Sequence, residues 1–559
     1  MRLACIALAI SCATTPRPFP LRAPMLVDTD TRPVSVACRP EPAGVRCAPA
    51  EVSSPYVWSF IDSVSFAPAS RVLSFEMKGE AANATSLDEV ADSAWFQNRI
   101  GVMPLGACKP EELLPVDVDD GAWVVDQLDD KKPREFRVAV PGKGLYVLKA
   151  DEPGTAERAS AAGVIGAAFY NAVGFNTSCE QIVLVRRSQF AIKPGLTMLN
   201  SAGKRKPFDA PALSAMLASS TQVSELTRMQ ATKSLPGLPL GPFTYDGVRA
   251  DDPNDVIAHE RRRELRGSRL LAAWLNHWDA RDLNTMDVWL ATDATRERSS
   301  PGYVRHYVID TRDVLGGHTE VPELTPRLGY EPIVSVPGIF LDFFTAGMIE
   351  RPWDRARKTP GRDKFGLFSE RDFDPAKWRG TYPNPAMLRM TERDGAWMAR
   401  IIARFTVADV RAIVATGQFS DPADVEHIVR VLMLRQQRIL ARYLTRLSPI
   451  ADVHAVAAGQ ICALDLARSS GVLPVGRFRY KVVQRAAGRT IQLATTTTNA
   501  GNVCFQPRSV APHDAADNAP TRIAVFELDN GTGAGPLEIH TYDLGVRGYV
   551  IVGLIRPSP

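Results

Sequence analysis

Residues 269–284 read RLLAAWLNHWDARDLN, and this stretch gives the first indication of the fold. Four large apolar side chains recur at three- and four-residue spacings, which predicts an amphipathic helix: Leu270, Leu271, Trp274 and Trp278. From Asn276 to Asn284, the chain then places two Asp, a His, an Arg and two Asn within nine residues. Such a run is typical either of an Asx-rich turn that caps a helix or of an oxygen-rich catalytic loop.

The predicted helix extends back through HERRRELRGS, residues 259–268. Its arginines and glutamates fall away from the apolar stripe, so we expect a solvated face with ion pairs one turn apart. After the polar run, TMDVWLAT (285–292) and GYVRHYVID (302–310) alternate apolar and polar residues. They predict a hairpin that ends in Asp310.

A strand-rich segment comes earlier in the chain. AWVVDQL (122–128), FRVAV (136–140) and LYVLKA (145–150) predict three strands, and the third ends near Lys149. The small and apolar residues of 155–172 predict a helix packed on the sheet, and QIVLV (181–185) predicts a fourth strand. Residues 88–101, DEVADSAWFQNRIG, are expected to form a short helix and a turn.

The 559 residues exceed what one core normally covers, so several packed units are expected. We predict an α+β protein with a signal or lipoprotein segment (1–20) and a linker (21–55). An N-terminal extension and β-rich lobe (56–195), a mostly helical lobe (196–450) and a β-rich C-terminal domain (451–559) follow. The last assignment rests on regularly spaced strand patterns such as RIAVFEL, LEIHTYDL and GYVIVGLI.

Composition excludes several classes of protein. Apolar residues make up 45% and charged residues 23%, which are ordinary globular values. Lys and Arg number 66 against 62 Asp and Glu, so the net charge of +4 gives no electrostatic footprint for nucleic acid. We therefore expect no nucleic-acid partner.

The first twenty residues, MRLACIALAISCATTPRPFP, combine one Arg, a short apolar run and small residues before Cys12. This pattern predicts a secretory signal, with AISC as an imperfect lipoprotein cleavage box. We expect export to the periplasm or cell envelope, with lipid anchoring through Cys12. A frayed apolar terminus is the alternative.

Of the eight cysteines, six lie beyond this segment, and no CxxC pair suggests a zinc site. In an oxidising compartment, Cys38 with Cys47 and Cys462 with Cys504 are candidate local disulfides. Buried free thiols remain the alternative.

Four polar residues match what phosphoryl transfer needs. Its catalysis consists mainly of positioning and cationic stabilisation of phosphate oxygens. Lys149 at a strand end suits the nucleotide phosphates, and Asp279 suits the acceptor hydroxyl. Asn284 and Asp310 offer the oxygen ligands that Mg²⁺ prefers. The spacing His277-x-Asp279-x₄-Asn284 reproduces the catalytic-loop pattern H-x-D-x-x-x-x-N.

With these motifs, the chain resembles the protein-kinase-like superfamily. It is most similar to a largely bacterial, uncharacterised group of kinase-like proteins sharing LDEV-DS-WF-NRIG, GPF-Y-G-R-DDPND---HE-RRELRG, AAWLNH-D----NT-D and RHY-ID. The match runs from about Trp58 to Leu447. The resemblance implies a two-lobed kinase-like fold, ATP and Mg²⁺ as cofactors, Asp279 as base, Lys149 on the phosphates, and Asn284 and Asp310 as metal ligands.

Three departures from the kinase pattern matter. The loop DDKKPRE between the first two strands has no glycine, so Lys131, Lys132 or Arg134 would have to supply the phosphate donors. In helix 155–172, Glu157 is the one acid available to pair with Lys149. Thr311 and Arg312 replace the usual Phe-Gly after the metal-binding Asp.

The function that follows is Mg²⁺-dependent transfer of a nucleotide γ-phosphate to a hydroxyl acceptor. The alternative is a catalytically inactive pseudokinase that serves as a binding scaffold at the envelope surface. It is favoured by the missing glycine loop and by export, because an exported protein meets little ATP. A glycosidase with paired carboxylates is a weaker third hypothesis, since no two acids are singled out.

Overall fold

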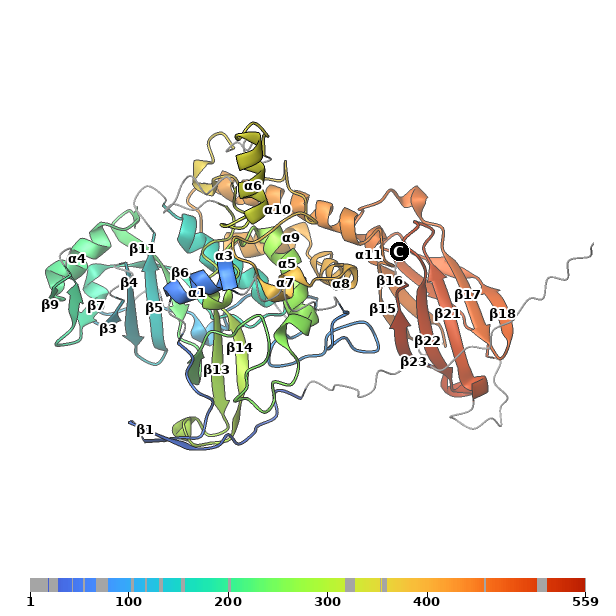
Figure 1. Cartoon of the computed structure of the whole chain (residues 1–559), viewed down its shortest axis with the longest axis horizontal. Coiled ribbons are helices and arrows are strands. Elements are labelled where there is room, and N and C mark those ends of the chain that lie inside the picture. The colour runs from blue at the N-terminus through green and yellow to red at the C-terminus, as the bar shows by residue number, and fades with distance from the viewer. Residues whose placement is uncertain are drawn as a thin grey trace, which may run out of the picture. The chain divides into compact units, whose positions relative to one another are not determined.

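The computed structural model describes residues 19, 29–42, 44–53, 56–66, 79–101, 105–115, 118–129, 134–151, 156–199, 203–316, 327–351, 353, 359–456, 459–509 and 520–557. Within them the chain has a mixed α+β fold, as predicted (Figure 1). It divides into two compact units. The larger comprises Val27–Asn83 and Val90–Ile439, and the smaller comprises Met1–Leu26, Ala84–Glu89 and Leu440–Pro559.

A seven-stranded sheet in the larger unit contains all four strands predicted for the first half of the chain. The order is β10-β11-β5-β4-β3-β7, with β6 also paired to β11; β3 and β7 are parallel and the other pairs antiparallel. Figure 1 shows β3, β4, β5 and β11 side by side. The strands are β3 (Trp123–Leu128), β4 (Glu135–Val140), β5 (Gly144–Ala150), β6 (Glu180–Val185), β7 (Phe190–Ile192), β10 (Gln222–Val223) and β11 (Leu226–Lys233).

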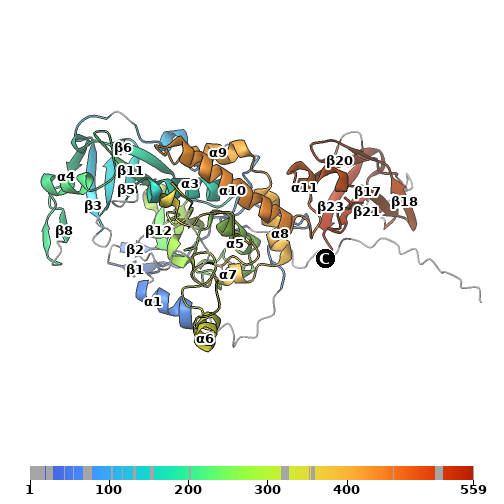
Figure 2. The same cartoon turned by 90° about the horizontal axis from the view of Figure 1, so that it is seen from above.

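The two faces of this sheet have different coverings. Apolar residues on one face, including Phe136, Tyr146 and Leu148, form a core with Leu213 and Leu217 of α4 (Ala210–Ala218). The other face packs against α3 (Arg158–Val173) through β6 and β11 (Figure 2). Because side chains alternate along a strand, Lys149 points to the α3 side.

A second, three-stranded sheet carries the predicted hairpin. It consists of β12 (Leu238–Gly241), β13 (Thr285–Ala291) and β14 (Gly302–Val308), all antiparallel. Several helices precede or follow these strands in the sequence: α1 (Tyr56–Ile61), α5 (Arg263–Leu275), α6 (Val336–Thr345), α7 (Pro385–Leu388), α8 (Glu392–Ile402), α9 (Val407–Ala415) and α10 (Pro422–Tyr443).

Two predictions about helices are wrong. The helix before the polar run begins at Arg263, because His259–Arg261 forms a 3₁₀ turn. Its charged face is not solvated: Arg263 and Arg266 are buried against Asp394 of α8, at 3.4 and 3.6 Å. Residues 88–101 form no helix. There the Ser93 hydroxyl accepts hydrogen bonds from the backbone of residues 95 and 96, and such local bonds compete with a helix.

Part of the predicted linker 21–55 packs on the larger unit where the structure describes it. Strands β1 (Arg39–Glu41) and β2 (Gly44–Arg46) form a hairpin closed by the predicted Cys38–Cys47 disulfide. Ala48 joins a buried cluster with Trp289 and Val304 of the three-stranded sheet. Apolar side chains interspersed among the prolines therefore give this segment a core to pack on.

The smaller unit is a sandwich of two antiparallel sheets with one shared core. One sheet has the order β15-β16-β20-β19 and the other β18-β17-β21-β22-β23. The predicted Cys462–Cys504 disulfide joins directly opposed residues of β16 and β20. The strands are β15 (Ile450–Ala455), β16 (Ile461–Asp465), β17 (Lys481–Ala486), β18 (Arg489–Leu493), β19 (Thr495–Thr497), β20 (Asn502–Phe505), β21 (Ile523–Asp529), β22 (Leu537–Asp543) and β23 (Tyr549–Ile555).

Two further features complete the fold. A third disulfide, Cys108–Cys179, joins residues 71 apart in the chain and was not predicted. A small hairpin, β8 (Thr197–Leu199) with β9 (Arg205–Pro207), precedes α4. Among the described helices, none is both long enough and apolar enough to cross a bilayer.

Candidate functional site

Lys149 lies on the third strand of the large sheet, β5, with 9% of its surface exposed. Burial lowers the pKa of its ammonium, but the negative charges of Asp310, Glu135 and Glu180 outweigh burial, and the net shift is upward. These three carboxylates act through their charge and not through a hydrogen bond. The ammonium therefore stays protonated beside negative charge, as a phosphate-binding lysine requires.

Glu135 of β4, directly opposite Lys149, and Glu180, at the start of β6, provide the nearby negative charge that was expected from Glu157. The pairing of Glu180 with Thr232 puts it on the same sheet face as Gln230 and Lys149, which are themselves cross-strand partners. The Gln230 amide donates to the Glu180 carboxylate, and Ser178 donates to it at 3.1 Å. Burial raises the pKa of Glu180, and the Lys149 charge opposes that rise.

Glu157 occupies a different place from the one expected. It precedes α3 in the left-handed region, with a φ of 66°. Its carboxylate accepts hydrogen bonds from Lys364 at 3.0 Å and from the backbone of Ser420 at 2.9 Å. Further along α3, Gly163 lies where a Cβ would collide with the Gln230 side chain. Glycine here leaves room for the Gln230–Glu180 pair.

The polar loop begins where α5 ends, and buried contacts fix that end. Asn276 caps the helix in the left-handed region, and its side-chain oxygen accepts from Trp378 at 2.9 Å. Arg435 of α10 donates to the last carbonyls of α5, at Ala273 and Trp274. A cation at a helix C-terminus is favoured by the helix dipole. The loop therefore leaves α5 in a defined direction.

His277 is buried directly under the loop. Its Nδ1 lies 2.7 Å from the Tyr170 hydroxyl on α3. Burial lowers the pKa of His277 to about 4, although the charge of Asp310 opposes this. The imidazole is therefore neutral at physiological pH and ties the loop to α3.

Asp279 and Asn284 lie together, as the spacing predicts. The Asn284 amide nitrogen donates to the backbone oxygen of Asp279 at 2.7 Å and to its carboxylate at 3.0 Å. Arg281 forms an ion pair with the same carboxylate at 2.9 Å. Burial raises the pKa of Asp279 to about 6, helped by the charge of Asp310 and opposed by Arg281 and Asn284. A carboxyl group with such a pKa is suited to accept a proton near neutral pH.

Asp310 follows β14 with a φ of 52°, a conformation that non-glycine residues rarely adopt. The residues on either side of it hold it in place. The backbone of Ile309 donates to Asn284 at 2.9 Å, and Arg312 donates to the carbonyl of Ala150 at 3.1 Å. Since Ala150 adjoins Lys149, these two bonds place Asp310 between the Lys149 strand and the Asp279–Asn284 loop.

Asp313 is a site residue that the sequence reasoning missed. Burial raises its pKa well above the ordinary value, and the charges of Asp279 and Asp310 add to the rise. The charges of three carboxyl groups from two loops thus act on one another. Asp313 follows Asp310 by only three residues, which could have indicated a second carboxylate at the site. Its spacing, however, does not distinguish it from an ordinary turn residue.

The structure describes only one of the three basic residues expected to donate hydrogen bonds to phosphate from the loop between the first two strands. Arg134 donates to the backbone oxygen of Asp151 at 3.1 Å and so lies beside the end of β5. Lys131 and Lys132 lie outside the described residues.

The oxygen donors suit Mg²⁺ by their chemistry. Because the Asn284 amide nitrogen is used by Asp279, the amide oxygen is the atom left to face a cation. Over the described ranges, no three His, Cys, Asp or Glu side chains converge closely enough to hold a metal ion by themselves. Mg²⁺ commonly takes only one or two protein carboxylates plus substrate phosphates, so Asp310 and Asn284 fit that requirement.

Replacing Gly166 of α3 with alanine is expected to destabilise the larger unit. A Cβ there would lie 2.6 Å from Thr311 Cβ and 3.1 Å from its backbone oxygen, next to Asp310. Overpacking of this kind costs about 1–3 kcal/mol, measured as the free energy of unfolding in urea. Gly476→Ala, which meets nothing within 4 Å, is the control and should change it little. Equal stability of the two variants would contradict the packing described here.

Comparison with known protein families, curated proteins and solved structures gives no match to this chain.

Proposed function

We propose that this protein is a kinase-like phosphotransferase that moves the γ-phosphate of a nucleotide to a hydroxyl acceptor with Mg²⁺. One observation carries the proposal: Asp310 is held between Lys149 and the Asp279–Asn284 pair by hydrogen bonds of its neighbours to Ala150 and Asn284. A lysine, a base and two metal-type ligands from distant parts of the chain then meet in one place. Phosphoryl transfer requires this set.

The order of the elements supports the kinase-like, two-lobed arrangement as part of this proposal. Lys149 is on the third strand of its sheet, and α3 follows that strand. Protein kinases likewise carry the phosphate lysine on the third strand, before the helix that bears its glutamate partner. Here α3 has no acid facing Lys149, and Glu180 of β6 supplies the negative charge.

In the proposed reaction, the acceptor oxygen bonds to the γ-phosphorus while the bond from that phosphorus to the β–γ bridging oxygen breaks. The nucleoside diphosphate leaves, and the acceptor's proton passes to the Asp279 carboxylate. Arg281 holds that carboxylate in place, and Lys149 would bind the phosphate oxygens of the nucleotide. Bound Mg²⁺ would neutralise charge on those oxygens.

The alternative is a pseudokinase scaffold that uses the same cluster of residues for binding only. It is supported by α3, which contains no acidic residue and so offers no helix glutamate to Lys149. The three disulfides support the export expected in both proposals, because such bonds persist in oxidising compartments. Lipid anchoring through Cys12 remains part of the proposal for either function.

Thermal unfolding with Mg²⁺ and ATP tests the proposal. We expect the melting temperature of the wild-type protein to rise at millimolar MgATP, because a ligand that binds only the native state stabilises it. Asp310→Ala should lose this rise, since it removes a ligand of the cation.

Two outcomes separate the candidate functions. A rise that depends on Asp310, accompanied by slow ATP hydrolysis, supports the phosphotransferase, whereas the same rise without turnover supports a nucleotide-binding pseudokinase. No rise in the wild-type protein would overturn both nucleotide-dependent roles and leave a scaffold that binds another ligand.

A further inference from the structure

A pocket of about 770 Å³ opens beside the Cys108–Cys179 disulfide, apart from the Lys149 and Asp279 cluster. Its described lining comes from residues 97–99 and 105–112, the end of α3, the turn before β6, the end of β11 with the residues that follow it, and β14. Its volume lies within the range of small-molecule sites. None of the residues assigned above to phosphoryl transfer lines it.

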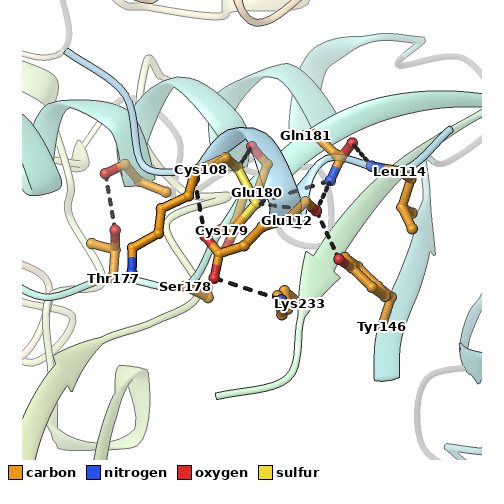
Figure 3. The surroundings of a disulfide bond; sticks show 12 residues. Cys108, Glu112, Leu114, Tyr146, Thr177, Ser178, Cys179, Glu180, Gln181 and Lys233 are labelled. Carbon is orange, nitrogen blue, oxygen red and sulfur yellow. Dashed lines mark hydrogen bonds and ion pairs between the residues drawn. A yellow bond between two sulfur atoms is a disulfide. The ribbon is translucent and has the colours of Figure 1, made fainter. Parts of the chain in front are cut away.

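A disulfide and hydrogen bonds connect segments that line the pocket (Figure 3). The disulfide joins Cys108 of one wall to Cys179 of the other. The backbone oxygen of Glu112 accepts hydrogen bonds from Tyr146 at 2.7 Å and from Gln181 at 3.2 Å. A preformed cavity binds a ligand with less loss of conformational entropy than a flexible loop does.

The charge of the lining is strongly positive. Four cations, Arg99, Lys109, Lys233 and Arg305, line the pocket, and Glu112 is the one carboxylate among its described lining residues. Glu112 is already paired with Lys233 at 3.6 Å. The positive charge of the other three cations is therefore not balanced inside the pocket.

Arg99 and Arg305 both line the pocket, and their positive charges act on each other. Arg99 donates four hydrogen bonds, all to uncharged oxygens; those of Asn171 and Phe175 are backbone carbonyls at 3.0 and 2.7 Å. Burial and the charge of Arg305 lower the pKa of Arg99 to about 10, with Asp92 opposing. Arg305 donates to the Tyr303 hydroxyl at 2.9 Å. Two guanidinium groups placed so are unfavourable alone and favourable around an anion.

The remaining lining offers neutral hydrogen-bonding groups, including the hydroxyls of Ser178, Ser234 and Tyr307. Such groups suit the hydroxyls of a ligand, whereas guanidinium and ammonium groups suit its anionic oxygens. We propose that this pocket binds a small hydroxylated molecule carrying phosphate or sulfate, held by hydrogen bonds from Arg305 and Lys109 and by the positive charge of Arg99. The proposal does not depend on the phosphotransferase activity.

Isothermal titration calorimetry of the full chain with glucose 6-phosphate, glucose 6-sulfate and glucose tests this site at low ionic strength. We expect at least one of the two anions to bind and glucose to give no heat. Which ester binds more tightly identifies the source of the anionic group. Arg305→Gln is expected to weaken binding on the order of 10-fold, because a charge-assisted hydrogen bond is lost.

Two further variants keep the test interpretable. Lys109→Gln changes an exposed residue and should weaken binding without affecting folding. Arg296→Gln also removes one arginine charge, but from an exposed turn whose residues do not line the pocket. It should leave the affinity for the ester unchanged. Binding of neither ester, or equal losses in Arg296→Gln and Arg305→Gln, would overturn the proposal.

Discussion

Asp279→Asn is expected to lower the rate of phosphoryl transfer by about 10²–10⁴-fold, the contribution of a positioned general base. The asparagine keeps the size of the side chain and its place beside Asn284 and Arg281, but it cannot accept the proton of the acceptor. The measurement is release of phosphate from γ-labelled ATP to water or to an added alcohol at saturating MgATP.

The matched control is Asp293→Asn in the exposed turn between β13 and β14. It makes the same chemical change outside the cluster and should retain the wild-type rate. The MgATP-dependent rise in melting temperature should survive in Asp279→Asn, since nucleotide phosphates are assigned to other residues. If Asp279→Asn keeps its rate within a few-fold, Asp279 is not the base.

Lys149→Met is expected to weaken MgATP binding by roughly 10–100-fold, as lost charge-assisted hydrogen bonds to phosphate are worth about 1.5–3 kcal/mol. Methionine fills the buried volume without the charge. The change also removes the cation that opposes the high pKa of Glu180, so the Glu180 carboxyl should become easier to protonate. The dissociation constant is measured by calorimetry at fixed Mg²⁺.

Lys206→Met, on the exposed strand β9, is the control for loss of one lysine charge. It should bind MgATP like the wild-type protein. Equal affinities of wild type and Lys149→Met would show that the ammonium does not contact the nucleotide, and the phosphotransferase proposal would lose its phosphate-binding residue.

Local sequence patterns were sufficient for the elements that carry the site. Alternating residues predicted β3, β4, β5, β6 and the β13–β14 hairpin, because a half-buried strand needs that alternation. Asp279 and Asn284 lie in one short loop because they are five residues apart, and there the Asn284 amide bonds to the Asp279 carboxylate. Cys38–Cys47 and Cys462–Cys504 were predictable because they are close in sequence.

Sequence patterns gave wrong predictions where the burial or pairing of a charged side chain depends on a partner far away in the sequence. The arginines of the segment before α5 have the composition of a solvated face, yet Arg263 and Arg266 are buried because Asp394 of α8 compensates their charge. Glu157 was the one acid of the predicted helix 155–172, but Lys364 pairs with its carboxylate, and Asp310, Glu135 and Glu180 act on the lysine instead.

The sequence alone determined which side chains could supply the proposed phosphoryl-transfer chemistry and their order along the chain. They are a strand lysine, a loop with Asp279 and Asn284, and Asp310 after a hairpin. Tertiary structure alone decided that they meet, that Glu180 and Asp313 join them, and that a cationic pocket forms beside Cys108–Cys179. The physical reason is that these interactions differ in how far apart in the sequence their partners lie. Hydrogen bonding within a turn is fixed by neighbours in sequence, whereas burial and charge depend on every segment that packs nearby.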